Sequence, residues 1–228
     1  MALSELVCLL DVDNTLLDND RVTVDMRRFL ESEVGPERCR RYWQLFEQLR
    51  QELGYADYLG ALQRYRDEFP RDPRVLHLSR YWIDYPFANR LYPESLDVID
   101  RLKELGQVAI LSDGDVVFQP RKVDRAGLNT AVDDNVLIYV HKEHELDDVE
   151  ARFPARHYVV VDDKLRILAA IKKVWGDRVT TVFPRQGHYA LDPAILASEP
   201  PADITVERIG DIVRLNPESL LNTPRQLK

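Results

Sequence analysis

Four short runs of apolar residues, each followed at once by polar or charged side chains, constrain the fold of this chain most. They cover residues 7–10, 108–111, 136–140 and 158–161. Each run is far too short to cross a membrane and is apolar on both of its faces. We therefore interpret all four as strands buried inside a parallel sheet.

Helical patterns separate these predicted strands. In residues 96–105, for example, apolar side chains recur at helical spacing until Gly106 ends the pattern. Two further strands are expected at residues 179–183 and 204–206. Strands that alternate with helices pair in parallel through right-handed crossovers. The sequence thus predicts an α/β fold with a three-layer, doubly wound, mostly parallel sheet and a Rossmann-like core.

Residues 18–89 interrupt this alternation, because every segment in them has a helical pattern. Gly35-Pro36 separates two of the expected helices. The block enters directly after the first strand, at the carboxyl edge of the sheet, so we expect a helical cap domain that covers a site there. We interpret its many aromatic residues as the core of a small helix bundle. The predicted domains are an α/β core, residues 1–17 and 90–228, and a cap, residues 18–89.

Charge and cysteine content disfavour several classes of protein. The formal net charge of −8 over 228 residues argues against a nucleic-acid binder or a protein of anionic membranes. Cys8 and Cys39 are the only cysteines and form no Cys-x-x-Cys pair, which favours a reducing compartment. The sequence shows no signal peptide or transmembrane segment. We expect a cytoplasmic protein, and the sequence does not indicate its oligomeric state.

The carboxyl ends of the predicted strands carry polar side chains of complementary types. Open α/β folds bind ligands at this edge. Two carboxylates about 5 Å apart repel by about 3 kcal/mol at an effective dielectric of about 20, so a cation or a reaction is expected beside them. Acids suit a divalent cation, whereas a hydroxyl and an ammonium suit phosphoryl oxygens. Each acid or serine alone also fits a turn or a helix cap, and the lysine alone fits an exposed loop, but their joint occurrence favours a site. They are Asp11 and Asp13, Ser112, Lys142, and Asp162 and Asp163.

In this order the set resembles the motifs of the haloacid dehalogenase-like (HAD) hydrolase superfamily. Four motifs in order are a specific signal, whereas one alone is weak. The helical block 18–89 is similar in position to the type 1 cap of that family. The matches are Asp11-Val12-Asp13-Asn14-Thr15 for the first motif, Ser112 for the second, Lys142 for the third, and Asp162 with Asp163 for the fourth.

The lysine is the least specific of these matches. Many members of the family have proline after it, whereas Glu143 follows Lys142 here. Lys122, in the helix expected after Ser112, is the alternative. We prefer Lys142 because it follows a predicted strand, where the motif lysine belongs.

The resemblance implies chemistry on phosphate esters, because the dehalogenases of the family lack an acid at the position of Asp13. It implies that Asp11 attacks phosphorus and forms an aspartyl-phosphate. Asp13 would protonate the leaving oxygen and then take a proton from the attacking water. Mg²⁺ would be held by Asp11, the backbone carbonyl of Asp13 and Asp162, with Asp163 acting through a water or orienting Lys142. The groups implied to bind the phosphoryl oxygens are Ser112, Lys142 and backbone amides near Val12, Asp13 and Asp113.

We therefore expect a Mg²⁺-dependent phosphomonoester hydrolase that acts on a small phosphorylated metabolite. Two alternatives stay open. A phosphotransferase or mutase would use the same aspartyl-phosphate and shield it from water. A non-enzymatic phosphoacceptor that resembles a response-regulator receiver is disfavoured, because receivers carry the acceptor aspartate on a later strand and have no large cap.

Other polar residues have a solvated and a functional interpretation. His188 is expected at the active edge, where it either touches substrate or is a plain loop residue. His141 and His144 lie three residues apart, but no third metal ligand is nearby, so we expect them to be solvated. Three cap arginines either meet an anionic substrate or form a solvated helix face, which we favour; they are Arg38, Arg40 and Arg41.

Overall fold

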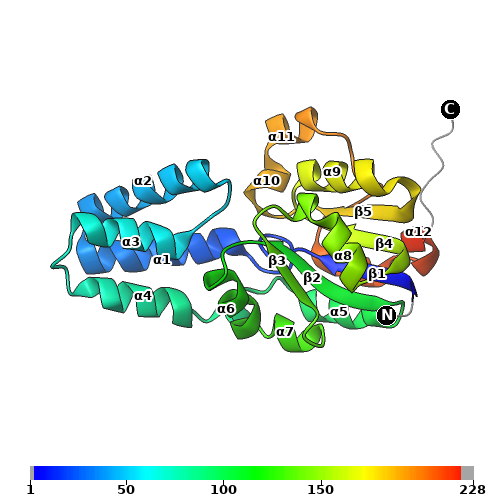
Figure 1. The fold of residues 1–228 in the computed structure, drawn as a ribbon, viewed down its shortest axis with the longest axis horizontal. Coiled ribbons are helices and arrows are strands. Elements are labelled where there is room, and N and C mark those ends of the chain that lie inside the picture. Colours follow the sequence, from blue (N-terminus) through cyan, green and yellow to red (C-terminus); the bar gives the residue numbers. More distant parts are fainter. Residues whose placement is uncertain (1–2, 222–228) are drawn as a thin grey trace.

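A parallel sheet organises the chain in the computed structural model, which describes residues 3–221 (Figure 1). The six strands lie in the order β3-β2-β1-β4-β5-β6, and every neighbouring pair is parallel. This order confirms the predicted doubly wound α/β fold, and its direction reverses beside β1, at the point where such sheets bind ligands. The strands are β1 (Ser4–Leu10), β2 (Gln107–Asp113), β3 (Val136–Tyr139), β4 (Ala155–Val161), β5 (Val179–Pro184) and β6 (Ile204–Val206).

Helices cover both faces of the sheet. Helices α5, α6 and α7 lie on one face, and α8 and α9 lie on the other (Figure 1). The core helices are α5 (Ser95–Lys103), α6 (Phe118–Arg125), α7 (Leu128–Ala131), α8 (Leu146–Arg152), α9 (Leu165–Trp175), α10 (Gly187–Leu191), α11 (Pro193–Ser198) and α12 (Pro217–Leu221), with short 3₁₀ helices η2 (Lys142–His144), η3 (Gly176–Arg178) and η4 (Ile209–Arg214).

The central strand β1 is buried on both faces because its side chains alternate between two hydrophobic cores. Leu6, Cys8 and Leu10 belong to the core that includes α5 and α6. Val7 and Leu9 belong to the core that includes α8 and α9. This explains why β1 shows a continuous apolar run instead of an alternating pattern.

The helical block predicted from the sequence lies between β1 and β2 and extends to one side of the sheet (Figure 1). Leu17 and Leu91 form an antiparallel bridge, and the Asp18 N–H donates to the Arg90 carbonyl at 2.8 Å. The chain therefore enters and leaves the block at the same place, although the division at residues 18–89 stays a prediction. The block contains α1 (Asn19–Val34), α2 (Pro36–Leu53), α3 (Tyr58–Glu68), α4 (Arg74–Asp84) and η1 (Phe87–Arg90).

Local sequence signals set the ends of these cap helices. The Asp18 carboxylate accepts a hydrogen bond from the Arg21 N–H at 2.8 Å and caps the start of α1. Gly35 has a φ of 81° between α1 and α2, a conformation that glycine adopts without strain, and Pro36 then occupies the first position of α2. The Gly35-Pro36 break read from the sequence is thus the turn between two antiparallel helices.

Aromatic side chains fill the interior of the cap. Tyr42 and Trp82 are fully buried, and the Trp82 indole N–H donates to the Tyr42 hydroxyl at 3.0 Å. The same hydroxyl donates to the Tyr58 carbonyl at 3.0 Å. Tyr42 therefore links three cap helices through one oxygen atom.

None of the helices between residues 3 and 221 is both long enough and hydrophobic enough to cross a membrane.

We expect Tyr42→Phe to lower the free energy of unfolding by about 1–3 kcal/mol, because it leaves the buried Trp82 N–H without a partner and removes a second hydrogen bond from the Tyr58 carbonyl. The measurement is the midpoint of urea unfolding at unchanged m. Tyr81→Phe is the matched control, since no hydrogen bond within residues 3–221 involves its hydroxyl, and it should change stability by less than about 0.5 kcal/mol. Equal losses in the two variants would show that the shared hydroxyl contributes nothing specific.

Candidate active site

The chain turns sharply directly after β1. The N–H groups of Leu16 and Leu17 donate to the Val12 carbonyl at 3.0 and 2.9 Å. Asn14 has a φ of 62°, a left-handed conformation that asparagine tolerates, and its amide donates to the Asp20 carboxylate at 3.1 Å. The Val12 side chain is fully buried, so only its backbone could meet a ligand, as the sequence interpretation requires.

The register of the sheet brings the acids of the first and fourth motifs together. Leu10 of β1 is paired with Val161 of β4, so Asp11 and Asp162 leave two neighbouring strands at the same height. The Asp11 N–H donates to the Val161 carbonyl at 3.0 Å and extends this pairing by one residue. Residues 151 positions apart in the sequence thus become direct neighbours at the carboxyl edge.

Asp11, Asp162 and Asp163 form a buried group in which one carboxylate oxygen from each acid lies within 4.8 Å of the other two. Both oxygens of Asp163 and the Oδ2 of Asp11 are buried without a hydrogen-bond partner among residues 3–221. The Thr15 hydroxyl accepts from the Asp163 N–H at 3.0 Å, which fixes the position of this acid. Within that part of the chain, no other group of histidines, cysteines or acids has the spacing of a metal site.

Burial changes the protonation behaviour of this group. It raises the pKa of Asp163 well above its usual range and also raises the pKa of Asp162, because the charged carboxylates lose their hydration. Unpaired oxygens and raised pKa values show that the three acids are not balanced by the side chains around them.

Lys142 lies against two of these acids. Its Nζ donates to Asp11 Oδ1 at 2.5 Å and to the Leu111 carbonyl at 3.1 Å. It also lies 2.7 Å from Asp162 Oδ2, an ion pair without the geometry of a hydrogen bond. Burial alone would lower the pKa of Lys142, but the charges of Asp11 and Asp162 outweigh burial and raise it. The ammonium therefore remains charged between two carboxylates.

Lys122, the alternative lysine, contacts the other acid of the first motif. Its Nζ donates to both oxygens of Asp13 at 2.6 and 2.8 Å and to Asn19 at 3.1 Å. Gln119, one turn earlier in α6, donates to Asp13 at 3.3 Å and to the Ser112 hydroxyl at 3.0 Å. This network holds Asp13 beside Ser112. The sequence interpretation considered Lys122 only as a competitor of Lys142, although Gln119 and Lys122 are three apart and share one face of a helix.

Asp113 and Lys142 are joined through the backbone. The Asp113 carboxylate accepts from the Lys142 N–H at 2.8 Å, which ties the end of β2 to the segment after β3. The structure thus places all the residues singled out from the four motifs at one edge of the sheet.

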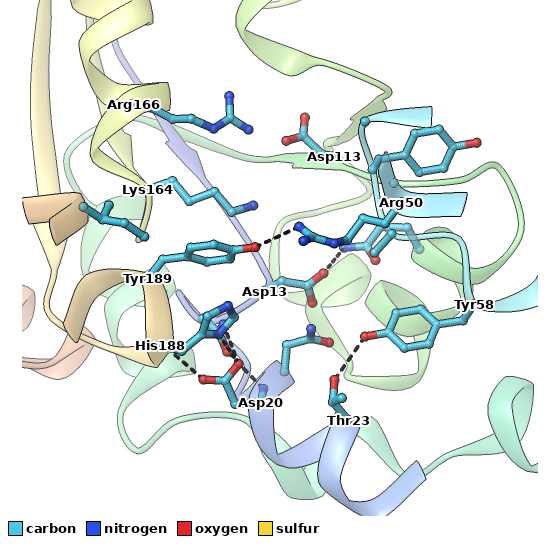
Figure 2. Close-up of a pocket in the computed structure, with 18 of the residues that line it drawn as sticks. Asp13, Asp20, Thr23, Arg50, Tyr58, Asp113, Lys164, Arg166, His188 and Tyr189 are labelled. Atoms are coloured by element: carbon cyan, nitrogen blue, oxygen red, sulfur yellow. Dashed lines mark hydrogen bonds and ion pairs between the residues drawn. The ribbon is translucent and has the colours of Figure 1, made fainter. Parts of the chain in front are cut away.

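A cavity of about 770 Å³ lies between cap and core, with Asp13 in its wall (Figure 2). The Arg50 guanidinium of α2 donates to the Tyr189 hydroxyl of α10 at 3.3 Å, and this contact connects the cap with the core. Other cavity-lining residues include Phe46, Tyr55 and Tyr58 from the cap, and Asp113, Lys122, Lys164, Arg166 and His188 from the core.

The secondary candidates differ in their positions. His188 lines the cavity, and its Nδ1 lies 2.6 Å from Asp20 Oδ1. Arg38, Arg40 and Arg41 do not line it; Arg38 and Arg41 pair with carboxylates of the cap. Arg50 lies in the wall instead. The sequence interpretation did not consider Arg50, because its exposure to the cavity depends on how the cap meets the core.

Comparisons with known proteins agree with this geometry. The model of the haloacid dehalogenase-like hydrolase family matches residues 6–174. A haloacid dehalogenase-like hydrolase from Burkholderia xenovorans LB400 has 61% sequence identity and a TM-score of 0.90, over 95% of this chain and 99% of that chain. No curated protein matches the sequence.

Two more distant structures share the fold. The HAD hydrolase YfnB from Bacillus subtilis, whose structure is bound to magnesium, has 14% identity and a TM-score of 0.61, over 92% of this chain and 97% of that chain. L-2-haloacid dehalogenase from Xanthobacter autotrophicus has 20% identity and a TM-score of 0.59, over the same shares of 92% and 97%. From its matched family model and its 61% identical relative, this chain belongs to the haloacid dehalogenase-like hydrolase family.

Proposed function

We propose that this protein is a Mg²⁺-dependent phosphatase that hydrolyses a small phosphate monoester through an aspartyl-phosphate on Asp11. The observation that carries the proposal is the placement of a fourth acid, Asp13, in the cavity wall beside the three buried acids. With Asp13 in addition to Asp11, the cleavage of an ester can use two different carboxylates. One carboxylate attacks phosphorus, and the other handles the proton of the leaving group.

The residues present fit a magnesium ion. Mg²⁺ prefers oxygen ligands, and the buried group offers four oxygens without hydrogen-bond partners among residues 3–221, from Asp11, Asp162 and Asp163. Three buried carboxylates, with the ammonium of Lys142 in contact and that of Lys164 at a longer distance, leave an excess of negative charge that a divalent cation would offset. Asp11, Asp162 and the Asp13 carbonyl would hold the ion, with Asp163 at a metal-bound water. When bound, Mg²⁺ would neutralise charge on the phosphoryl oxygens.

The side chains of the protein would then carry the reaction in two steps. The Asp11 carboxylate attacks phosphorus, and the phosphorus–oxygen bond of the ester breaks. Asp13, protonated on an oxygen that has left the Lys122 ammonium, gives its proton to the leaving oxygen. In the second step Asp13 takes a proton from water, which attacks the aspartyl-phosphate and releases phosphate. Lys142, Ser112 and nearby backbone amides, including those of Val12 and Asp113, would hold the phosphoryl oxygens as charge redistributes.

The network around Asp13 supports phosphate-ester chemistry over dehalogenation. A halide leaves without a proton, so a dehalogenase has no task for an acid at this position. Here Lys122 and Gln119 hold Asp13 by three hydrogen bonds, two from Lys122 and one from Gln119. Because these bonds fix the orientation of Asp13, they favour a role in which its carboxylate contacts the substrate.

A phosphotransferase or mutase remains the second candidate, because it uses the same aspartyl-phosphate. The two functions differ in the acceptor, so phosphate release to water is compared with transfer to an added alcohol or sugar. A receiver-like phosphoacceptor is the weakest candidate, and a phosphoprotein that persists after treatment with a small phosphodonor would support it.

Asp11→Asn should abolish the Mg²⁺-dependent hydrolysis of p-nitrophenyl phosphate, because an amide does not attack phosphorus. EDTA should abolish the activity of the unaltered protein, and added Mg²⁺ should restore it. The measurement is the release of p-nitrophenol. Appreciable turnover by the variant would remove Asp11 from the role of nucleophile, and full activity in EDTA would end the metal proposal.

Asp13→Asn should slow the hydrolysis of an alkyl phosphate by about 10²- to 10⁴-fold, the usual contribution of a general acid. The loss should be smaller with p-nitrophenyl phosphate, whose leaving group needs less protonation. Steady-state kinetics with both substrates measure the difference. Equal losses with the two would argue against proton transfer by Asp13.

Asp163→Asn should stabilise the metal-free protein, because it removes a buried carboxylate charge whose oxygens accept no hydrogen bond among residues 3–221. Since the pKa of Asp163 is higher in the folded chain than in the unfolded chain, ionisation of this group lowers stability as the pH rises above about 4. The variant should therefore exceed the unaltered protein in free energy of unfolding by more at pH 7 than at pH 4. Each kcal/mol corresponds to about 2–4 °C in Tm for a chain of this size.

Magnesium provides the second half of this experiment. At about 100 times its Kd, Mg²⁺ should add about 2.7 kcal/mol of stability to the unaltered protein and less to Asp163→Asn. Asp100→Asn, which changes an exposed carboxylate, is the control and should behave like the unaltered protein. If Mg²⁺ raises the Tm of all three proteins equally, the ion does not bind at Asp163.

A further inference from the structure

Lys164 is a cation of the cavity wall without a counter-ion in direct contact. Burial alone would lower the pKa of Lys164, but the nearby charges of Asp163, Asp11 and Asp162 raise it. It follows the two acids at the end of β4, and its side chain extends into the cavity (Figure 2). No hydrogen bond or ion pair within residues 3–221 involves its ammonium. The Nζ lies 5.6 Å from the centroid of the Tyr189 ring, a contact that leaves its three N–H donors free for a ligand.

The other cations of this wall already have acidic partners. Each of them lies within 2.8 Å of a carboxylate oxygen, so its charge is balanced by the protein itself. The pairs are Arg50 with Glu47, Lys122 with Asp13, Arg166 with Glu143, and His188, if protonated, with Asp20. Lys164 differs from them because no acidic side chain contacts its ammonium directly, and Asp163, Asp11 and Asp162 act on its charge only from a longer distance.

Tyr189 places Lys164 opposite Arg50. The face of its ring meets the Lys164 ammonium, and its hydroxyl accepts from the Arg50 guanidinium at 3.3 Å. In Figure 2 the two cations point toward each other from core and cap, above Asp13. The hydroxyl proton of Tyr189 has no acceptor among residues 3–221, so the tyrosine can donate to a ligand here as well.

We propose that Lys164, Tyr189 and Arg50 form a subsite for a second anionic group of the substrate, a carboxylate or a second phosphate. This inference rests on the proposed function and narrows the substrate to phosphorylated acids or bisphosphates. Lys164 supplies most of the free N–H donors, because Arg50 already donates to Glu47 and Tyr189. Glu47 also repels an anion on the cap side of Arg50, which favours the position between Arg50 and Lys164.

The test uses pairs of substrates that differ only in the second anionic group. We would measure kcat/KM with Mg²⁺ for 2-phosphoglycolate against ethyl phosphate, and for propane-1,3-diol bisphosphate against propyl phosphate. The first pair tests a carboxylate and the second pair tests a second phosphate. A charge-assisted contact predicts a preference of about ten- to a hundredfold for the anionic member of at least one pair. Equal kcat/KM values within both pairs would overturn the subsite.

Variants of Lys164 test whether this residue causes the preference for the anionic substrate. Lys164→Met should reduce the ratio within the preferred pair at least tenfold, and Lys164→Arg should recover part of it because the charge returns. Lys173→Met, at an exposed position of α9, is the matched control and should keep the ratio of the unaltered protein. If Lys164→Met slows both members of each pair equally, Lys164 serves the reacting phosphoryl group and the subsite is wrong.

A binding measurement separates this inference from the proposed function. Asp11→Asn lacks the proposed nucleophile, so calorimetry with Mg²⁺ reports the affinity for each compound without turnover. Preferential binding of an anionic member that is lost in Asp11→Asn/Lys164→Met supports the subsite even if no ester is hydrolysed. Hydrolysis of ethyl phosphate with no preference in either assay would leave the phosphatase in place and remove the subsite.

Discussion

The buried contact of Lys142 with Asp11 and Asp162 holds the site together. Removing three carboxylates from water is costly, and one ammonium offsets only part of that cost. The remaining imbalance appears as unpaired oxygens on Asp11 and Asp163 and as the raised pKa of Asp163. A cation bound during function would offset this excess of negative charge and would explain why the acids lie together in the core.

The sheet supplies the rigidity that this arrangement needs. Asp11 and Asp162 end neighbouring strands whose register is fixed by side chains packed on both faces. A slip of one residue would move those side chains to the wrong face, so the positions of the two acids are set by hydrophobic packing. The precise spacing of charged groups is therefore a consequence of the apolar core beneath them.

The cap contributes groups of a different kind. Its interior is closed by aromatic packing around Tyr42, and it meets the core through the contact of Arg50 with Tyr189. The core edge thus carries the acids and Lys142, while the cavity between the two parts carries groups suited to distinguish one substrate from another. Under the proposed function this division would separate the reaction from the choice of substrate. Helix α6 connects the two regions through the contacts of Lys122 and Gln119 with Asp13.

The sequence by itself determined the sheet, the position of the helical block and the acids at the strand ends. It could do so because buried parallel strands require continuous apolar runs, and the residue after each run must lie at the same edge. Only the tertiary structure decided that Lys142 contacts Asp11 while Lys122 contacts Asp13, and that Lys164 and Arg50 flank Tyr189. Those contacts join residues from different helices and from both parts of the chain, so they depend on how the helices pack, which no local pattern specifies.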